Sequence, residues 1–134
     1  MEDFDTKPVV AVPKGLPPDE LMTEDLIEGE GIEAEGGHTV FLHYVGVSWS
    51  SGREFDSSWK RDQLFDFTIS GGGVIRGWDL GVRGMKAGGR RRLTIPPKLA
   101  YGNNAIGGVI AANDTLIFVV DLHRIRIPGT PSQS

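Results

Sequence analysis

Several aromatic side chains lie next to turn-rich segments of the chain, and their types suit the binding of an apolar ligand. They are Tyr44, Phe55, Phe65, Trp78, Tyr101 and Phe118. Aromatic residues dominate protein cores, so any one of them could serve packing alone. If buried, the hydroxyls of Tyr44 and Tyr101 and the carboxylate of Asp56 would need polar partners. Together these residues predict a concave apolar site with a few polar groups, which is typical of pockets for small ligands.

Reactions that need a nucleophile, a metal ion or a phosphate-binding loop lack their usual residues in this chain. The 134 residues include no cysteine and no Gly-x-Ser-x-Gly sequence. His38, His43 and His123 do not have metal-ligand spacing, and we expect them at the surface or at sheet edges. The glycine-rich stretch at 71–77 lacks the Gly-Lys-Ser/Thr of a phosphate loop. We therefore predict that the protein uses no metal and no cofactor.

The charge balance and the chain ends limit the partners and the location of the protein. The formal net charge of −4 disfavours nucleic acid, because phosphate binding needs a basic face. We interpret the arginine run at 90–92 as a charged sheet surface with one arginine at the start of a strand. No window approaches the roughly 18 apolar residues that span a bilayer. The acidic, proline-bearing start is unlike a secretory signal, so we predict a cytoplasmic protein with no membrane partner.

Alternation of apolar and polar residues predicts strands through most of the chain. The expected strands cover residues 21–27, 38–48, 53–56, 64–70, 90–96 and 115–127. Ile75, Trp78, Val82 and Met85 recur at helical spacing, which predicts one short helix within residues 74–85. Each glycine in this helix costs about 1 kcal/mol relative to alanine, so the helix needs burial against the sheet. The sequence therefore predicts an α+β fold, with an antiparallel sheet of five to six strands wrapping one short α-helix.

Five collinear motifs run through the same region. They are HYVG at 43–46, FDSSW at 55–59 with Arg61 shortly after, FTISGGGVIRGWDLGVRGM at 67–85, GGRRRLTIPPKLAYG at 88–102 and DTLIFVVDL at 114–122. In type, order and spacing these motifs resemble the FKBP-type peptidyl-prolyl isomerase family over roughly residues 20–127. The resemblance implies a curled, half-barrel-like sheet with the active pocket between sheet and helix. We expect an isomerase domain at 21–127, a flexible extension at 1–20 and a disordered tail at 128–134.

The family's site residues carry over onto matching positions of this sequence. The resemblance assigns catalysis to Tyr44, Asp56, Trp78, Tyr101 and Phe118. It assigns substrate binding to Phe55, Arg61, Phe65, Val74, Ile75, Ile106, Val109 and Ile110. Trp78 would form the pocket floor under the proline ring, and the Ile75 N–H and the Tyr101 hydroxyl would donate to peptide carbonyls. Arg61 would orient Asp56. Val74 and the loop around Ile106 to Ile110 would border the entrance.

The resemblance implies a peptidyl-prolyl cis–trans isomerase that accelerates X–Pro rotation by non-covalent binding in this aromatic pocket. Its partners would be proline-containing peptides, unfolded or partly folded proteins and macrolide inhibitors, and we expect a monomer. The alternative is a non-catalytic chaperone or regulatory module that binds peptides in the same pocket. The chain departs from the family at Ala111 and Ala112, where many members carry two prolines, and at Ile106. We also expect the N-terminal extension to fold over the outer face of the sheet, near Phe41 and Val45.

Overall fold

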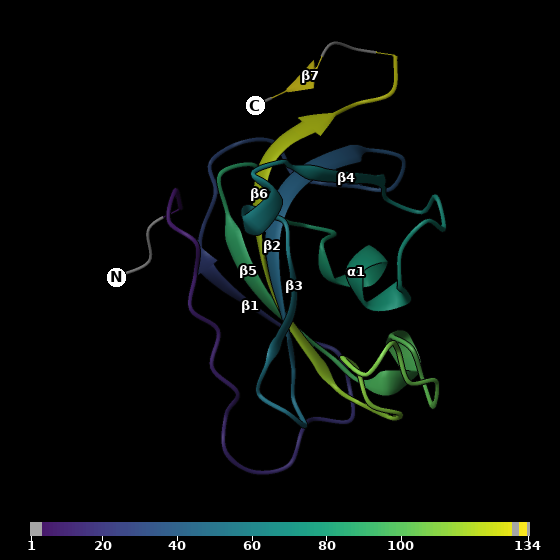
Figure 1. The fold of residues 1–134 in the computed structure, drawn as a ribbon. Coiled ribbons are helices and arrows are strands. Elements are labelled where there is room, and N and C mark those ends of the chain that lie inside the picture. Colours follow the sequence, from purple (N-terminus) through teal and green to yellow (C-terminus); the bar gives the residue numbers. More distant parts are fainter. Residues whose placement is uncertain (1–3, 130–131, 134) are drawn as a thin grey trace.

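The computed structural model describes residues 4–129 and 132–133, which fold around one antiparallel sheet (Figure 1). The strand order is β1-β5-β6-β2-β3, while β4 pairs with β2 and β7 pairs with β6. The strands are β1 (Met22–Ile27), β2 (Thr39–Ser48), β3 (Glu54–Ser57), β4 (Phe65–Thr68), β5 (Arg90–Ile95), β6 (Leu116–Arg126) and β7 (Ser132–Gln133). The predicted curled antiparallel sheet around one short helix is confirmed, and the two-residue β7 comes in addition.

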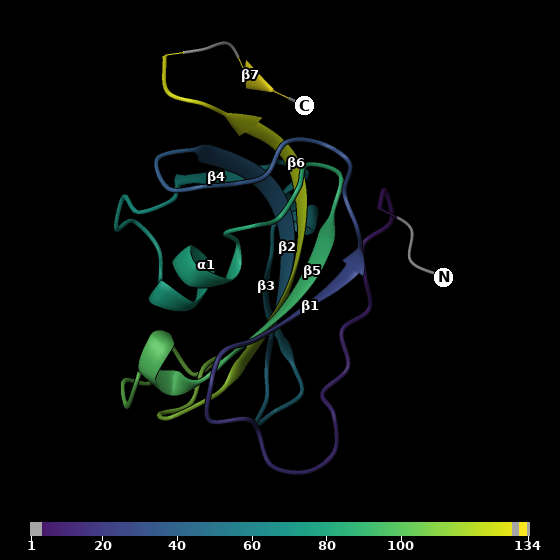
Figure 2. The same cartoon turned by 180° about the vertical axis from the view of Figure 1, so that it is seen from behind.

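The helix α1 (Arg76–Gly81) lies against the concave face of the sheet (Figures 1 and 2). It has only 6 residues, fewer than the apolar spacing predicts, because the chain leaves helical geometry after Val82. An added Cβ at Gly81 would lie 2.9 Å from Leu93 Cδ2 on β5. The glycine therefore lets the helix backbone approach the sheet more closely than any larger residue would allow. Burial of the helix on the sheet compensates for its poor intrinsic propensity.

The core lies between α1 and the concave face. The long central strands supply it through alternate residues, because successive side chains of a strand point to opposite faces. Its fully buried members include Val40, Leu42, Ile69, Val82, Leu93, Ile95, Leu116, Val120, Leu122 and Ile125. Two 3-10 helices, η1 (Trp59–Arg61) and η2 (Pro97–Leu99), complete the regular structure. Among the described residues, no helix combines the length and the apolarity needed to cross a bilayer.

The outer face of the sheet, which points away from α1, differs from the prediction. The side chain of Arg90 is 2% exposed and forms an ion pair of 2.5 Å with Asp121 on β6. Arg90 begins β5, as interpreted, but it does not belong to a charged surface. Val45, which also points to the outer face, is fully buried as well. The error over Arg90 arises because a period-2 pattern separates the two faces of a sheet but does not show which residues of a face other segments cover.

The N-terminal segment covers part of this outer face (Figure 2). Arg90 Nη2 donates to the Thr6 carbonyl at 2.7 Å, and the Phe4 ring lies 4.6 Å from the ring of His123. The segment thus lies over the outer face, as expected: it contacts Arg90 on β5 and His123 on β6, and Lys7 Nζ pairs with Glu54 on β3 at 3.1 Å. Residues 1–3 of the predicted flexible extension, and residues 130, 131 and 134 of the predicted disordered tail, lie outside the described residues. Within that tail, residues 132–133 pair with the end of β6.

Candidate functional site

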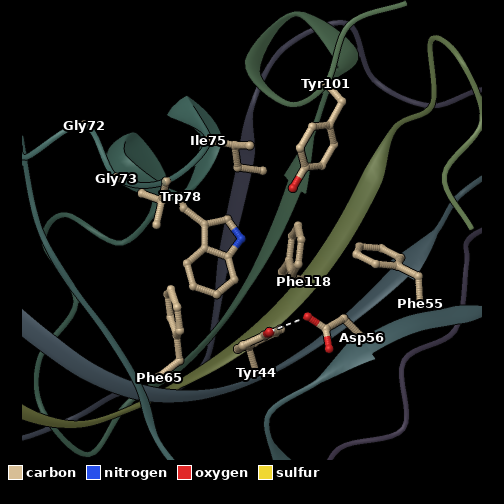
Figure 3. A pocket seen from close by; sticks show the side chains of 11 residues that line it. Tyr44, Phe55, Asp56, Phe65, Gly72, Gly73, Ile75, Trp78, Tyr101 and Phe118 are labelled. Atoms are coloured by element: carbon tan, nitrogen blue, oxygen red, sulfur yellow. Dashed lines mark hydrogen bonds between the residues drawn. The ribbon is translucent and has the colours of Figure 1, made fainter. Parts of the chain in front are cut away.

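A hollow of about 470 Å³ lies between α1 and the concave face of the sheet (Figure 3). Its lining residues are Tyr44, Phe55, Asp56, Phe65, Gly72, Gly73, Val74, Ile75, Trp78, Tyr101 and Phe118. They come from β2, β3, β4, the segment before α1, α1 itself, the loop after η2, and β6. The structure therefore brings together most of the site residues that the sequence had indicated, although they are far apart along the chain.

Trp78 forms the base of the hollow, and only 5% of its surface is exposed. Its ring centroid lies 5.0 Å from that of Tyr44, 5.1 Å from Phe118 and 5.6 Å from Phe65, all in edge-to-face geometry. Such contacts are the favoured arrangement of aromatic pairs and fix each ring against the next. The indole Nε1 of Trp78 is buried and has no hydrogen-bond partner among the described residues. The base is thus an apolar plane carrying one unused donor.

A glycine on β2 makes room for the wall opposite the helix. Gly46 pairs with Phe118 across the β2–β6 ladder. An added Cβ at Gly46 would lie 2.7 Å from Phe118 Cε1 and 2.8 Å from Phe55 Cζ. No real Cβ sits so close to a ring carbon, so only glycine allows both rings to lean over the strand. This glycine, in the HYVG motif, therefore shapes the hollow without lining it.

A polar cluster of Tyr44, Asp56 and Arg61 closes one side of the hollow. The Tyr44 hydroxyl donates to Asp56 Oδ2 at 2.5 Å. Arg61 Nη1 donates to Asp56 Oδ1, and Arg61 Nη2 donates to the Tyr44 hydroxyl, both at 2.8 Å. Arg61 itself does not line the hollow; it lies behind the other two residues on η1. The guanidinium therefore fixes both polar groups that face the site.

The pKa values of this cluster exclude it as an acid or base near neutral pH. Burial, together with the hydrogen bond to Asp56, raises the pKa of Tyr44 to about 12. Burial alone would raise the pKa of Asp56, but hydrogen bonds from Arg61, Tyr44 and the Ser57 N–H outweigh it and lower that pKa. Tyr44 therefore stays a neutral phenol and Asp56 stays ionised at pH 7. An effective general acid or base has a pKa near the working pH, so the cluster suits fixed electrostatics rather than proton transfer.

Two hydrogen-bond donors belong to residues that line the hollow, Tyr101 and Ile75. The Tyr101 side chain points into it from the loop after η2, and its hydroxyl has no intramolecular partner among the described residues (Figure 3). Ile75 has extended backbone geometry as the residue that precedes α1, with φ −60° and ψ 150°. Its N–H likewise has no partner within the described part of the chain. Both donors are therefore available to a bound ligand.

The loop predicted to border the entrance does not line the hollow. Ile106 and Ile110 pair with each other in an isolated bridge, so this loop folds back on itself. Ile110 is 4% exposed and packs into the core, whereas Ile106 and Val109 project into solvent. Sequence analysis also missed two lining residues, Gly72 and Gly73. The triple glycine at 71–73 lies within the motif at 67–85 and is the available signal, but the resemblance assigns no site role to it.

The three histidines lie outside the hollow, and the described residues include no group of three or more His, Cys, Asp or Glu side chains arranged to hold a metal ion. His38 lies in the turn before β2, where its Nδ1 accepts from the Glu35 N–H at 3.2 Å. His43 and His123 are partly buried on the outer face, with ring centroids 5.4 Å apart. Their expected position at the surface or at a sheet edge is only partly correct, because Phe4 and Trp59 pack against them.

Comparisons with known proteins identify the family of the chain. Residues 30–123 match the FKBP-type peptidyl-prolyl cis-trans isomerase family. The chain is 55% identical over 117 residues to an FK506-binding protein of Streptomyces anulatus, covering 87% of this chain and 94% of that protein. It is 50% identical to FK506-binding protein 1A of Neurospora crassa over 109 residues, covering 81% and 90%.

Solved structures of the same family superpose on this chain. The crystal structure of AtFKBP13 superposes with a TM-score of 0.70 at 39% identity, covering 80% of this chain and 94% of that one. The crystal structure of FkpA from Escherichia coli superposes with a TM-score of 0.72 at 36% identity, covering 80% and 48%. The chain belongs to the family of FKBP-type peptidyl-prolyl cis-trans isomerases.

Proposed function

We propose that this protein is a peptidyl-prolyl cis–trans isomerase that turns X–Pro bonds in peptides and in folding proteins. The observation that carries the proposal is the hollow itself: an indole base, ring walls and free donors at the rim, with no acid, base or nucleophile poised for covalent chemistry. Membership of the family supports it. In this arrangement the proline ring lies on Trp78, and the walls are Tyr44, Phe55, Phe65 and Phe118.

The reaction asks for rotation about one amide bond. Resonance gives that bond a barrier of about 18–20 kcal/mol, and rotation of an X–Pro bond takes tens to hundreds of seconds. Twisting breaks the conjugation, so the carbonyl oxygen carries less negative charge in the transition state than in the planar amide. Water stabilises the charge-separated planar form. A hollow lined by rings removes that water and thus favours the twisted form over the planar one.

Asp56 would add to this preference. Its carboxylate is held ionised by Arg61 and Tyr44 at the edge of the hollow. A fixed negative charge beside the substrate carbonyl repels the more negative oxygen of the planar amide more strongly than that of the twisted one. Because the carboxylate is already oriented, no reorganisation is needed during rotation.

The donors at the rim would hold the flanking chain while the bond turns. The Ile75 N–H and the Tyr101 hydroxyl would each donate to a carbonyl of the bound peptide. Turnover in milliseconds instead of tens of seconds requires that the activation free energy of rotation fall by about 5–6 kcal/mol. Only interactions stronger in the transition state than in the ground state contribute to this, so we assign the total jointly to desolvation, Asp56 and these two donors.

The relatives' names extend the proposal to a second ligand. Because they are named for binding FK506, we expect this macrolide to occupy the same hollow and to inhibit isomerisation in competition with peptide. The exposed Ile106 and Val109 would contact the parts of a ligand that project beyond the hollow. We further propose that the protein acts as a monomer in the cytoplasm.

The test is an NMR exchange measurement on an X–Pro tetrapeptide, paired with refolding of a protein limited by proline isomerisation. We expect both to accelerate with catalytic amounts of the protein. Trp78→Leu should abolish most of the acceleration, whereas Trp49→Leu, a matched change outside the hollow, should keep it. Binding of the peptide without acceleration would instead support the alternative, a non-catalytic chaperone or regulatory module.

A further inference from the structure

The backbone of Tyr44 is linked to the outer face of the sheet through one buried hydroxyl. Ser58 begins η1 and is 0% exposed. Its Oγ accepts from the Tyr44 N–H at 2.7 Å and lies 2.8 Å from Nδ1 of His43. The Ser58 N–H donates to the Tyr44 carbonyl at 3.0 Å. A single side chain therefore joins His43, which points away from the hollow, to Tyr44, which lines it.

The distances assign the proton of the Ser58 hydroxyl. A serine hydroxyl donates one hydrogen bond and accepts up to two. With the Tyr44 N–H on one lone pair, the hydroxyl proton can go to His43 Nδ1 at 2.8 Å or to the Tyr44 carbonyl at 3.4 Å. The shorter contact favours His43, because a hydroxyl donor prefers about 2.5–3.0 Å. His43 is then a neutral imidazole with its proton on Nε2.

Protonation of His43 would reverse this bond. Nδ1 would become a donor to Ser58 Oγ, which would then accept two N–H groups and have only the distant Tyr44 carbonyl for its own proton. The same residue starts the 3-10 turn that carries Arg61, since the Arg61 N–H donates to the Ser58 carbonyl at 3.1 Å. A shift of Ser58 would therefore move two members of the polar cluster, Tyr44 and Arg61, relative to each other.

We propose that His43, acting through the Ser58 hydroxyl, is a positioning residue for the Tyr44–Asp56–Arg61 cluster, so that gain of a proton by His43 lowers turnover. The inference rests on the proposed isomerase function. Its basis is the continuous chain of contacts from the outer face to the hollow. The stacking of His43 on Trp59, with centroids 4.4 Å apart, fixes the ring plane that aims Nδ1 at Ser58.

Other groups around His43 set the pH at which it titrates. Burial lowers the pKa of His43, and the carboxylate of Asp62, which follows η1, opposes that shift. On β6, the His123 ring contacts the His43 ring edge-on. Asp121 lies directly across from His43 in the β2–β6 pairing and forms an ion pair with Arg90 of β5. Burial and the charge on His43 lower the pKa of His123, while Asp5 in the N-terminal segment opposes this. Adjacent imidazoles resist double protonation, so the pKa of His43 lies on the acid side of its ordinary value.

The experiment is a pH profile of kcat/KM from 5 to 8 for a tetrapeptide without titrating groups in that range. In the wild type, kcat/KM should fall about threefold to tenfold on the acid side, the loss expected for weakening one hydrogen bond. The midpoint should match that of the His43 imidazole in NMR. His43→Phe keeps a stacking ring but no acceptor, so its profile should be flat and low. His43→Asn restores an acceptor at the Nδ1 position and should be flat and several-fold higher.

Controls separate this role from a structural one. His38→Asn changes a histidine far from Ser58 and should keep the wild-type profile. Thermal melts at each pH would show that every variant stays folded. A wild-type profile that is flat while His43 titrates, or a His43→Phe profile equal to the wild type, would overturn the proposal and leave the isomerase function standing. If turnover is absent at every pH, the isomerase function fails, and the NMR signal of the Tyr44 amide then tests the His43–Ser58–Tyr44 connection. A Tyr44 amide signal that does not follow the His43 titration would overturn that connection.

Discussion

The Tyr101 hydroxyl offers the cleanest separation of function from stability. It points into the hollow and has no intramolecular partner among the described residues. Tyr101→Phe should therefore leave the free energy of unfolding within about 0.5 kcal/mol of the wild type, as for other surface changes. Loss of one hydrogen bond to the bound peptide corresponds to about 0.5–1.5 kcal/mol, or roughly a twofold to tenfold fall in kcat/KM.

The assay is NMR exchange on an X–Pro tetrapeptide, run alongside urea unfolding of the same samples. Tyr44→Phe is the matched control, because Tyr44 is the only other tyrosine and its hydroxyl bonds both Asp56 and Arg61. Tyr44→Phe should lower stability and turnover together, whereas Tyr101→Phe should lower turnover alone. Unchanged kinetics in Tyr101→Phe would remove this hydroxyl from the mechanism, and a large loss of stability would refute the description of it as free.

Three further changes test other parts of the account. Gly46→Ala should lower peptide affinity and cost about 1–3 kcal/mol of stability, because the added Cβ collides with Phe118. Calorimetry measures the peptide affinity and urea unfolding measures the stability. Unchanged peptide affinity would contradict the role of Gly46 in shaping the hollow. Arg90→Met should cost about 3–5 kcal/mol because it removes one partner of a buried ion pair. Adding Asp121→Leu should restore most of that stability in thermal unfolding. The pKa of Asp56 is lower in the folded than in the unfolded protein, so the ionised carboxylate stabilises the fold above the unfolded-state pKa. This stabilisation is lost as pH falls through the folded-state pKa. Asp56→Asn should therefore flatten the acid side of the plot of stability against pH, and an unchanged acid side would count against the Asp56 interactions.

Local pattern predicted the sheet and the burial of the helix well. Alternation located the long strands β2 and β6, and the helical spacing identified Trp78, Val82 and Met85 as residues that face the core. The length of the helix could not be predicted from that spacing. Val82 and Met85 are buried as expected, but they belong to the turn after the helix. Apolar spacing thus reports which residues face the core, not which hydrogen bonds the backbone makes.

The aromatic residues of the hollow were predictable because their motifs are local and distinctive. What the sequence could not reveal is which residues of the outer face the N-terminal segment contacts. The residues next to Arg90 in the sequence do not predict its burial. That burial depends on Asp121 and on the Thr6 carbonyl, which is more than 80 residues away. Ser58 appears in the sequence only as part of the FDSSW motif, although it links two sides of the sheet. Such roles depend on long-range register, which one sequence does not specify.

The most direct test of the account measures bond rotation and contact with the indole in one NMR sample. An X–Pro peptide is titrated into the protein while the Trp78 Nε1 signal and the cis–trans exchange rate are recorded together. The account predicts that the exchange rate rises at least a thousandfold over the uncatalysed rate, which takes about 4 kcal/mol off the barrier, and that the Nε1 signal shifts as the hollow fills. A shifted Nε1 signal with an exchange rate equal to that of free peptide would contradict it.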